Sequence, residues 1–253
     1  MQNSQGTPSG LFFRPSWFRL LAGRADFHHG LLAWLTIYAV AMAYMESAVV
    51  VYLRAIYYPQ GFDFPLALMP PGMVAIEMGR EAATLIMLLG VAALAGVDRW
   101  ERFLAFCFSF GVWDIFYYAW LWVFVRWPPS LLTWDVLFLI PVPWIAPVLA
   151  PVIVSVTLVA GSLLMLRLKA RGVRLGFSAP VWTLAVTGGL VVLGSFMLDF
   201  ASVLHQMKPP PFRWGVFAIG VGLAVTALIL GVSRLEHVVA GSVSKAPPQT
   251  AET

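Results

Sequence analysis

Charged residues are scarce in this chain. Asp, Glu, Lys and Arg make up only 11% of its 253 residues, whereas 60% of the residues are hydrophobic. A soluble domain carries about 25% charged residues, and so few charges cannot cover the surface of a water-soluble fold of this size. The composition therefore excludes an ordinary soluble domain and predicts a protein embedded in a lipid bilayer.

Cysteine and histidine motifs are also missing. The single cysteine, Cys107, lies in an apolar stretch and can form neither an internal disulfide nor a Cys-based metal motif. The four histidines form no His-box or HExxH motif, and no CxxC or GxSxG sequence is present. The familiar signatures of desaturases, zinc proteases and serine hydrolases are therefore absent.

Long apolar runs dominate the chain instead. A membrane-spanning helix needs about 20 mostly apolar residues. Six stretches meet this requirement, at about 30–53, 72–97, 100–126, 143–168, 180–204 and 213–234. The first is longer than the apolar region of a cleavable signal peptide, about 7–15 residues. We therefore predict an all-α fold, a polytopic transmembrane helix bundle of about six spans.

Basic residues in two segments predict the orientation of this bundle. They are Arg14, Arg19 and Arg24 before the first span, and Arg167, Lys169, Arg171 and Arg174 after the fourth. The positive-inside rule places both segments, and hence both termini, on the cytoplasmic side. The net charge of +4 then reflects membrane orientation, and we expect no nucleic-acid partner. We expect the partner to be the lipid bilayer of a bacterial cytoplasmic (inner) membrane.

The segments outside the predicted spans divide the chain further. Residues 1–29 are expected to form a cytoplasmic tail with a basic amphipathic interfacial segment. Residues 30–236 form the membrane domain, and 237–253 a disordered cytoplasmic tail. An apolar run of about ten residues near 130–142 is too short to span a bilayer, so it predicts a re-entrant or interfacial helix.

Prolines and small residues predict local features of the spans. Pro143, Pro147 and Pro151 recur at a spacing of four and predict a kinked start of the fourth span. The pairs Ala185/Gly189 and Ala218/Gly222 have the spacing that permits close contact between membrane helices.

Five carboxylates lie inside the predicted spans, at least five residues from either end: Glu46, Glu77, Glu81, Asp114 and Asp199. An ionisable group in a bilayer is costly and by default indicates a functional site. With a helical rise of about 1.5 Å per residue, these acids are expected to form one layer in the outer half of the membrane. Arg80 is the strong cation among them. Its depth matches that of Glu46, which predicts an ion pair between the two.

Charge counting leaves at least three of these acids without a cation. Such groups either hold a proton near neutral pH or recruit a cation. The predicted catalytic acid–base residues are Glu46, Glu77, Glu81 and Asp114. The same four, with His205, are also a possible set of ligands for a divalent metal ion. The structural alternatives are an interfacial ion pair of Asp199 with Lys208 or Arg213, and a position of Glu77 near the start of its helix that suits the helix dipole.

Aromatic residues surround the predicted acidic layer. Tyr117 and Tyr118 follow Asp114 by three and four residues, so they share its helix face. Their hydroxyls and flat rings suit an organic ligand, and the alternative is a packing stripe. The predicted substrate-binding residues are Arg80, Tyr44, Tyr117, Tyr118 and Trp113.

Three functions remain open at this point. The first is a membrane-embedded enzyme or ligand-binding protein that acts on a lipid-soluble or small organic substrate by acid–base or metal-assisted chemistry. The second is a non-catalytic subunit or assembly factor of a larger membrane complex, with other membrane subunits as partners. The third is a proton- or cation-coupled transporter, against which the scarcity of polar residues in the cytoplasmic halves of the spans counts.

Overall fold

The computed structural model describes the backbone of residues 24–244 and the side chains of residues 30–233. The predicted tails, at 1–29 and 237–253, therefore lie largely outside the described residues. Within the described residues the chain is mostly helical, and six helices are long and apolar enough to cross a membrane. The predicted all-α bundle of about six spans is thus confirmed, and the chain is a multi-pass membrane protein.

The first three spans pack together in one group. They are α2 (Arg24–Tyr57), α3 (Pro71–Ala95) and α4 (Arg99–Val125). Helix α4 lies at the centre, because it packs against α2, α3 and the fourth span. Asp98 starts α4 by accepting hydrogen bonds from the backbone N–H groups of Trp100 and Glu101, at 2.9 and 3.0 Å. The side-chain cap fixes where this central helix begins.

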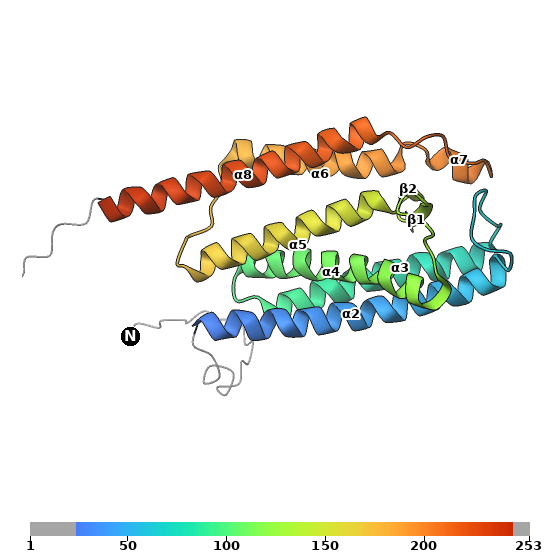
Figure 1. Ribbon diagram of the computed structural model, residues 1–253, viewed down its shortest axis with the longest axis horizontal. Helices are drawn as coiled ribbons and strands as arrows, with labels where there is room; N and C mark the ends of the chain where they lie inside the picture. Colours follow the sequence, from blue (N-terminus) through green and yellow to red (C-terminus); the bar gives the residue numbers. More distant parts are fainter. Residues whose placement is uncertain (1–23, 245–253) are drawn as a thin grey trace, which may run out of the picture.

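The fourth span, α5 (Leu149–Ala170), lies between these three helices and the last ones (Figure 1). The last ones are α6 (Ala179–Met197), the short α7 (Phe200–Leu204) and α8 (Trp214–Ser244). Helices α6 and α8 pack tightly on each other, whereas their contacts with α5 are far fewer. The bundle therefore consists of a four-helix group, α2–α5, and an attached helix pair, α6 and α8.

The close contact between α6 and α8 depends on Gly188 and Gly220, and not on the predicted Gly189 and Gly222. A Cβ atom on Gly188 would lie 2.7 Å from the backbone of Ala224 and of Gly220. By contrast, a Cβ atom on Gly189 or Gly222 would meet nothing within 4 Å. The small-residue contact between membrane helices is present, but it uses the neighbouring face of each helix.

A β-hairpin replaces the predicted interfacial helix near 130–142. Strands β1 (Trp134–Phe138) and β2 (Trp144–Pro147) pair antiparallel, with Trp134 opposite Pro147 and Val136 opposite Ile145. The helix prediction was wrong because Pro141 and Pro143 interrupt a helical hydrogen-bond pattern and because aromatic and β-branched residues favour strands.

The predicted proline kink of the fourth span is wrong for a related reason. Helix α5 begins at Leu149 and not at 143, so Pro143 and Pro147 precede it. Pro151 lies in the first turn, where backbone N–H groups have no acceptor within the helix, so the N–H that proline lacks is not missed as a hydrogen-bond donor. The prolines define the hairpin and the start of α5 and do not bend the span.

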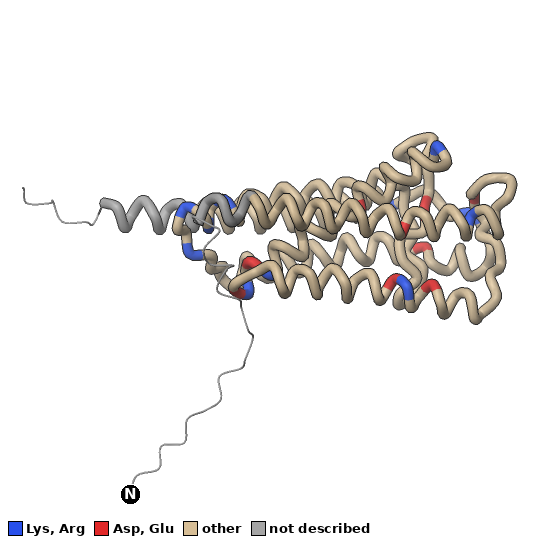
Figure 2. Tube along the Cα trace, turned by 90° about the horizontal axis from the view of Figure 1, so that it is seen from below, with Lys and Arg blue, Asp and Glu red and all other residues tan. Residues whose placement is uncertain are grey.

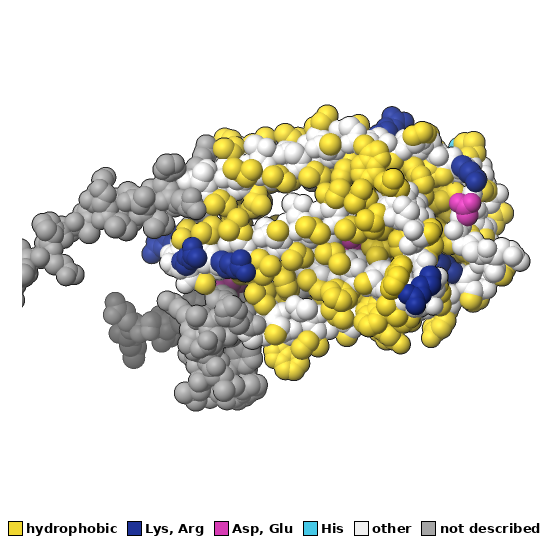
Figure 3. Space-filling model, viewed as in Figure 1, with side chains coloured by type: hydrophobic (Ala, Val, Ile, Leu, Met, Phe, Trp, Pro, Cys, Tyr) yellow, Lys and Arg dark blue, Asp and Glu magenta, His cyan; other side chains and the backbone are white. Residues whose placement is uncertain are grey.

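The basic loop 167–174 lies at one end of the bundle, where its Lys169 pairs with Asp98 and Glu101. The other acids of the first three spans lie toward the opposite end (Figure 2). Hydrophobic side chains cover much of the flank between them (Figure 3). An even number of spans puts the two ends of the described chain on the same side. That this side is cytoplasmic, and that the membrane is a bacterial inner membrane, stay predictions.

Candidate functional site

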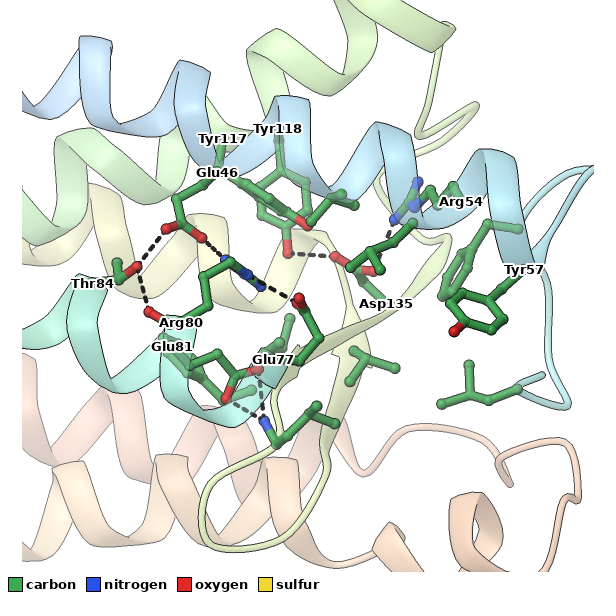
Figure 4. A pocket seen from close by; sticks show the side chains of 18 of the residues that line it. Glu46, Arg54, Tyr57, Glu77, Arg80, Glu81, Thr84, Tyr117, Tyr118 and Asp135 are labelled. Carbon is green, nitrogen blue, oxygen red and sulfur yellow. Dashed lines mark hydrogen bonds and ion pairs between the residues drawn. The ribbon is translucent and has the colours of Figure 1, made fainter. Parts of the chain in front are cut away.

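A pocket of about 160 Å³ opens at the end of the bundle opposite the basic loop. Helices α2, α3 and α4, the loop 58–70 and the hairpin strand β1 form its walls (Figure 4). Five carboxylates line it: Glu46, Glu77, Glu81, Asp114 and Asp135. All five are buried, and the two cations that line the pocket with them are Arg54 and Arg80. The pocket therefore carries more acidic than basic groups.

Arg80 connects two of the helices. Its guanidinium forms ion pairs with Glu46 on α2 and with Glu77 on its own helix, the latter at 2.9 Å. The other oxygen of Glu46 accepts a hydrogen bond from the hydroxyl of Thr84. The pairing of Arg80 with Glu46 that their matching depth predicts is therefore present, and one guanidinium is shared by the two acids.

Glu81 has a different environment from its neighbours. Its two carboxylate oxygens both accept a hydrogen bond from the backbone N–H of Leu139, at 3.1 and 2.8 Å. Leu139 directly follows β1, so the hairpin that the sequence did not predict supplies the partner. Among the described side chains Glu81 forms no ion pair.

Asp114 also lacks an ion pair among the described side chains. It accepts a hydrogen bond of 2.8 Å from the hydroxyl of Ser155 on α5. Gly111, one turn earlier on α4, allows this contact, because a Cβ atom there would lie 2.6 Å from the carbonyl oxygen of Ser155. A small residue thus lets the two helices approach closely enough for the hydroxyl to reach the acid.

Asp135 is the pocket acid that could not be singled out from the sequence. It pairs with Arg54 at 3.3 Å and accepts a hydrogen bond of 3.2 Å from the Tyr118 hydroxyl. Burial raises the pKa of Asp135 to about 6, although Arg54, the Val136 backbone N–H and Tyr118 each lower it. Asp135 lies in β1, outside the predicted spans. An available signal was its position in the strand-like run WDVLF, with Arg54 unpaired at the end of the first span.

Arg54 is held between aromatic rings. Its guanidinium carbon lies 3.7 Å from the ring centre of Trp127 and 4.3 Å from that of Phe62. Stacking on both rings fixes the guanidinium plane. One of its nitrogens, Nη1, is buried without an acceptor, as is the indole nitrogen of Trp113. Both residues line the pocket, so a ligand oxygen that reached either N–H group would satisfy it.

The predicted substrate-binding residues divide into two sets. Arg80, Trp113, Tyr117 and Tyr118 line the pocket. Tyr44 does not, because its exposed ring packs edge-on against Trp120 and Phe124 on the flank of the bundle. Asp199 also lies apart and pairs with Arg213 at 3.3 Å, which is one of its two predicted interfacial partners.

The predicted metal centre does not assemble. Within the described side chains, no three of His, Cys, Asp or Glu lie close enough to hold a metal ion. His205 is exposed at the end of α7 and its Nδ1 lies 2.8 Å from the carbonyl oxygen of Ala201. The carboxylates of the pocket already form ion pairs with guanidinium groups or accept hydrogen bonds from hydroxyls and a backbone N–H. These residues do not fit a divalent cation.

The chain matches no family model, and neither a curated protein nor a solved structure is significantly similar to it. The function is therefore argued from the pocket itself.

Proposed function

We propose that this protein is a membrane-embedded acid–base enzyme that acts on a small organic or lipid-soluble substrate in the charged pocket. One observation carries the proposal: Glu81 and Asp114 line the same buried cavity, and each is bound by neutral hydrogen-bond donors in place of a cation. A carboxyl group without a cation in apolar surroundings can hold a proton. Two such groups can give and accept protons on one substrate.

The ion pairs around these two acids give the pocket a fixed shape. Arg80 holds α2 and α3 together through Glu46, and Arg54 holds the hairpin through Asp135. Groups that are already oriented need little rearrangement when a reaction begins. Glu46, Glu77 and Asp135 are therefore proposed to position the site, and Glu81 and Asp114 to exchange protons with the substrate.

The size and lining of the pocket restrict the substrate. A volume of about 160 Å³ is below the range of roughly 300–1,000 Å³ that binds a drug-sized molecule. Apolar side chains, among them Val50, Leu53 and Leu137, line the space between the charged groups. The pocket therefore suits the reactive end of a substrate with one or two oxygen atoms, which the N–H groups of Arg54 and Trp113 would bind.

The test compares purified variants in lipid nanodiscs. Wild-type protein, Glu81→Gln and Asp114→Asn are incubated with lipid and metabolite extracts of the source cells, and the extracts are then analysed by mass spectrometry. Wild type is expected to convert at least one component, and both variants to lose the conversion. Glu101→Gln is the matched control, because Glu101 is a buried acid outside the pocket that pairs with Lys169 at 2.7 Å.

Infrared spectroscopy of the same samples adds a readout that needs no substrate. Only a protonated carboxyl group gives a carboxylic C=O stretching band, so at least one of Glu81→Gln and Asp114→Asn is expected to remove part of that band. Conversion that persists in both variants would overturn the proposal. So would a wild-type spectrum in which neither substitution changes the band.

Exposed apolar loop residues favour a second candidate, a subunit of a larger membrane complex. Leu68, Leu132 and Met207 are 79%, 60% and 53% exposed in loops at the end that carries the pocket. Apolar side chains at the edge of a membrane protein suit contact with another protein. Copurification of a stoichiometric partner that Leu68→Glu and Leu132→Glu release would support this role, and a monomer alone in mild detergent would contradict it.

A further inference from the structure

A second cavity lies between the two groups of helices. Its volume is about 440 Å³, within the range of roughly 300–1,000 Å³ that holds a sizeable ligand. The hollow separates the α6–α8 pair from α4 and α5 (Figure 3). Its walls are almost entirely apolar and include Phe103, Leu158, Met165, Leu193 and Leu228. An apolar lining of this kind selects hydrocarbon over any polar ligand.

The length of the cavity matches one leaflet of a bilayer. Along α6 it extends from Val181 to Leu193, which at about 1.5 Å per residue is about 18 Å. Half of a hydrocarbon core about 30 Å thick is about 15 Å. On α4 the lining runs from Trp100 to Cys107, the half nearer the basic loop. On α5 the lining reaches Val154, next to the Ser155 that bonds Asp114. The cavity therefore begins near the basic end and extends inward to the depth of Asp114.

Small residues keep this space open. Gly161, Ala185, Gly189 and Ala224 all line it, and a Cβ atom on Gly189 would meet nothing within 4 Å. Water is not expected in an apolar cavity at this depth, and an empty one would forfeit the dispersion contacts of its walls. The acyl chains of the surrounding bilayer are the material of matching length and polarity.

The rim of the cavity suits a negatively charged headgroup. Trp100, Trp182 and Phe177 cluster at this end, with the rings of Trp100 and Trp182 stacked at 5.7 Å. Arg171 and Arg174 are exposed in the loop that leads to Phe177. Basic residues at a membrane surface attract anionic lipids, and aromatic rings favour the headgroup level.

We propose that this cavity binds one acyl chain of an anionic phospholipid from the leaflet at the basic end, with the lipid phosphate beside Arg171 and Arg174. The acyl chain fills the gap between α2–α5 and the α6–α8 pair, so the lipid acts as a structural part of the bundle. This inference does not depend on the chemistry proposed for the charged pocket.

Photocrosslinking in nanodiscs tests the proposal. The probes are phosphatidylglycerol and phosphatidylcholine, each with a diazirine group in the acyl chain, at trace level in a phosphatidylcholine bilayer. Crosslinked peptides are mapped by mass spectrometry. In wild type, phosphatidylglycerol is expected to label peptides within 177–193 and 221–228 more strongly than the outward faces of α2 and α3, and more strongly than phosphatidylcholine does.

Two kinds of variant distinguish binding of the lipid acyl chain from binding of the lipid headgroup. Gly189→Leu fills the cavity and is expected to reduce labelling of both peptides several-fold, whereas Gly222→Leu, on an exposed face, is expected to leave it unchanged. Each basic residue near a membrane surface contributes about 1 kcal/mol, so Arg171→Gln with Arg174→Gln is expected to lower the affinity for phosphatidylglycerol about thirtyfold. Binding of phosphatidylcholine should change little.

Three results would overturn the proposal. They are labelling spread evenly over the outer surface of wild type, equal labelling by the two headgroups in wild type, and undiminished labelling of a folded Gly189→Leu protein. If that variant does not fold, the wild-type peptide map decides the question alone.

Discussion

Arg80 holds two carboxylates on two helices, so its removal affects more than one interaction. Glu46 and Glu77 are both buried, and each would remain in an apolar site without its cation. Breaking a buried ion pair by removing one partner costs more than the pair itself contributes, because the other charge stays buried. At the residue scale, the stability of the pocket therefore depends on charge balance.

Arg80→Gln is expected to destabilise the protein by about 3 kcal/mol, measured by thermal unfolding of the detergent-solubilised protein. Lys208→Gln is the control, since its pair with Asp63 is solvent-exposed and a surface ion pair contributes at most about 1 kcal/mol. The combination Arg80→Met, Glu46→Gln and Glu77→Gln should recover much of the loss. Equal effects of Arg80→Gln and Lys208→Gln would contradict the argument.

Asp135 makes stability depend on pH. Its pKa in the folded protein is about 6 because of burial, and that in an unfolded chain is about 3.9. The folded state therefore binds the proton more tightly. The resulting stabilisation is fully present below about pH 4 and is lost as the pH rises through about 6.

Compared with Asp135→Asn, the free energy of unfolding of wild type is expected to fall by up to about 3 kcal/mol between about pH 4 and pH 7. Chemical unfolding at several pH values measures this difference. Asp63→Asn, which removes an exposed carboxylate, reports the effect of losing a surface charge. Identical pH profiles for wild type and Asp135→Asn would show that the acid stays ionised in the fold.

At the element scale, the α6–α8 pair illustrates how one residue changes a helix face. Adjacent positions on a helix differ by about 100°, so Gly188 and Gly189 point to different neighbours. Gly188 lies against the backbone of α8, and Gly189 lies against the apolar cavity. The same pair of helices therefore uses one glycine for close packing and the next for open space.

Gly188→Ala and Gly189→Ala form a matched pair for this argument. Gly188→Ala is expected to destabilise the protein by about 1–3 kcal/mol, because its Cβ would overlap the α8 backbone. Gly189→Ala should be neutral or stabilising by up to about 1 kcal/mol, because alanine loses less backbone freedom in a helix. Thermal unfolding measures both, and equal destabilisation would mean that α6 is rotated relative to the packing described.

At the scale of the whole molecule, the six spans could be predicted because length and hydropathy determine them. Helices α3, α4, α6 and α8 begin within two residues of the predicted starts, whereas α2 begins at Arg24, before the predicted start at 30. Helix α5 begins six residues after the predicted start, because residues 144–147 form strand β2 of the hairpin. For the same reason Asp135 was missed, since its burial results from packing against Arg54 and Tyr118.

Helix depth predicted that Glu46, Glu77, Glu81 and Asp114 would gather, and that Arg80 would pair with Glu46, but not the partners of Glu81 and Asp114. The predicted Arg80–Glu46 contact is present. By contrast, the partners of Glu81 and Asp114 come from the hairpin and from α5. A sequence shows the depth of a residue along its span but not the rotation of neighbouring helices, and that rotation decides which groups meet. Tyr44, two residues before Glu46, faces the flank of the bundle for this reason.

The orientation of the bundle in the membrane can be tested with one thiol at each end. In a Cys107→Ser background, Gln60→Cys and Arg171→Cys place one exposed thiol at each end. The positive-inside rule predicts that a membrane-impermeant maleimide added to intact cells labels the first and not the second. Labelling of Arg171→Cys alone would reverse the assignment and put the charged pocket on the cytoplasmic side.

The origin of the pocket walls has a consequence for synthesis. Among the described residues, all those that line the charged pocket lie between Glu46 and Leu139, and none comes from α6 or α8. Because a ribosome makes the chain from its N-terminus, all of these residues have been translated before the final helix pair exists. The acidic site can thus be assembled on the nascent chain, and the last two spans dock onto a pocket that is already complete.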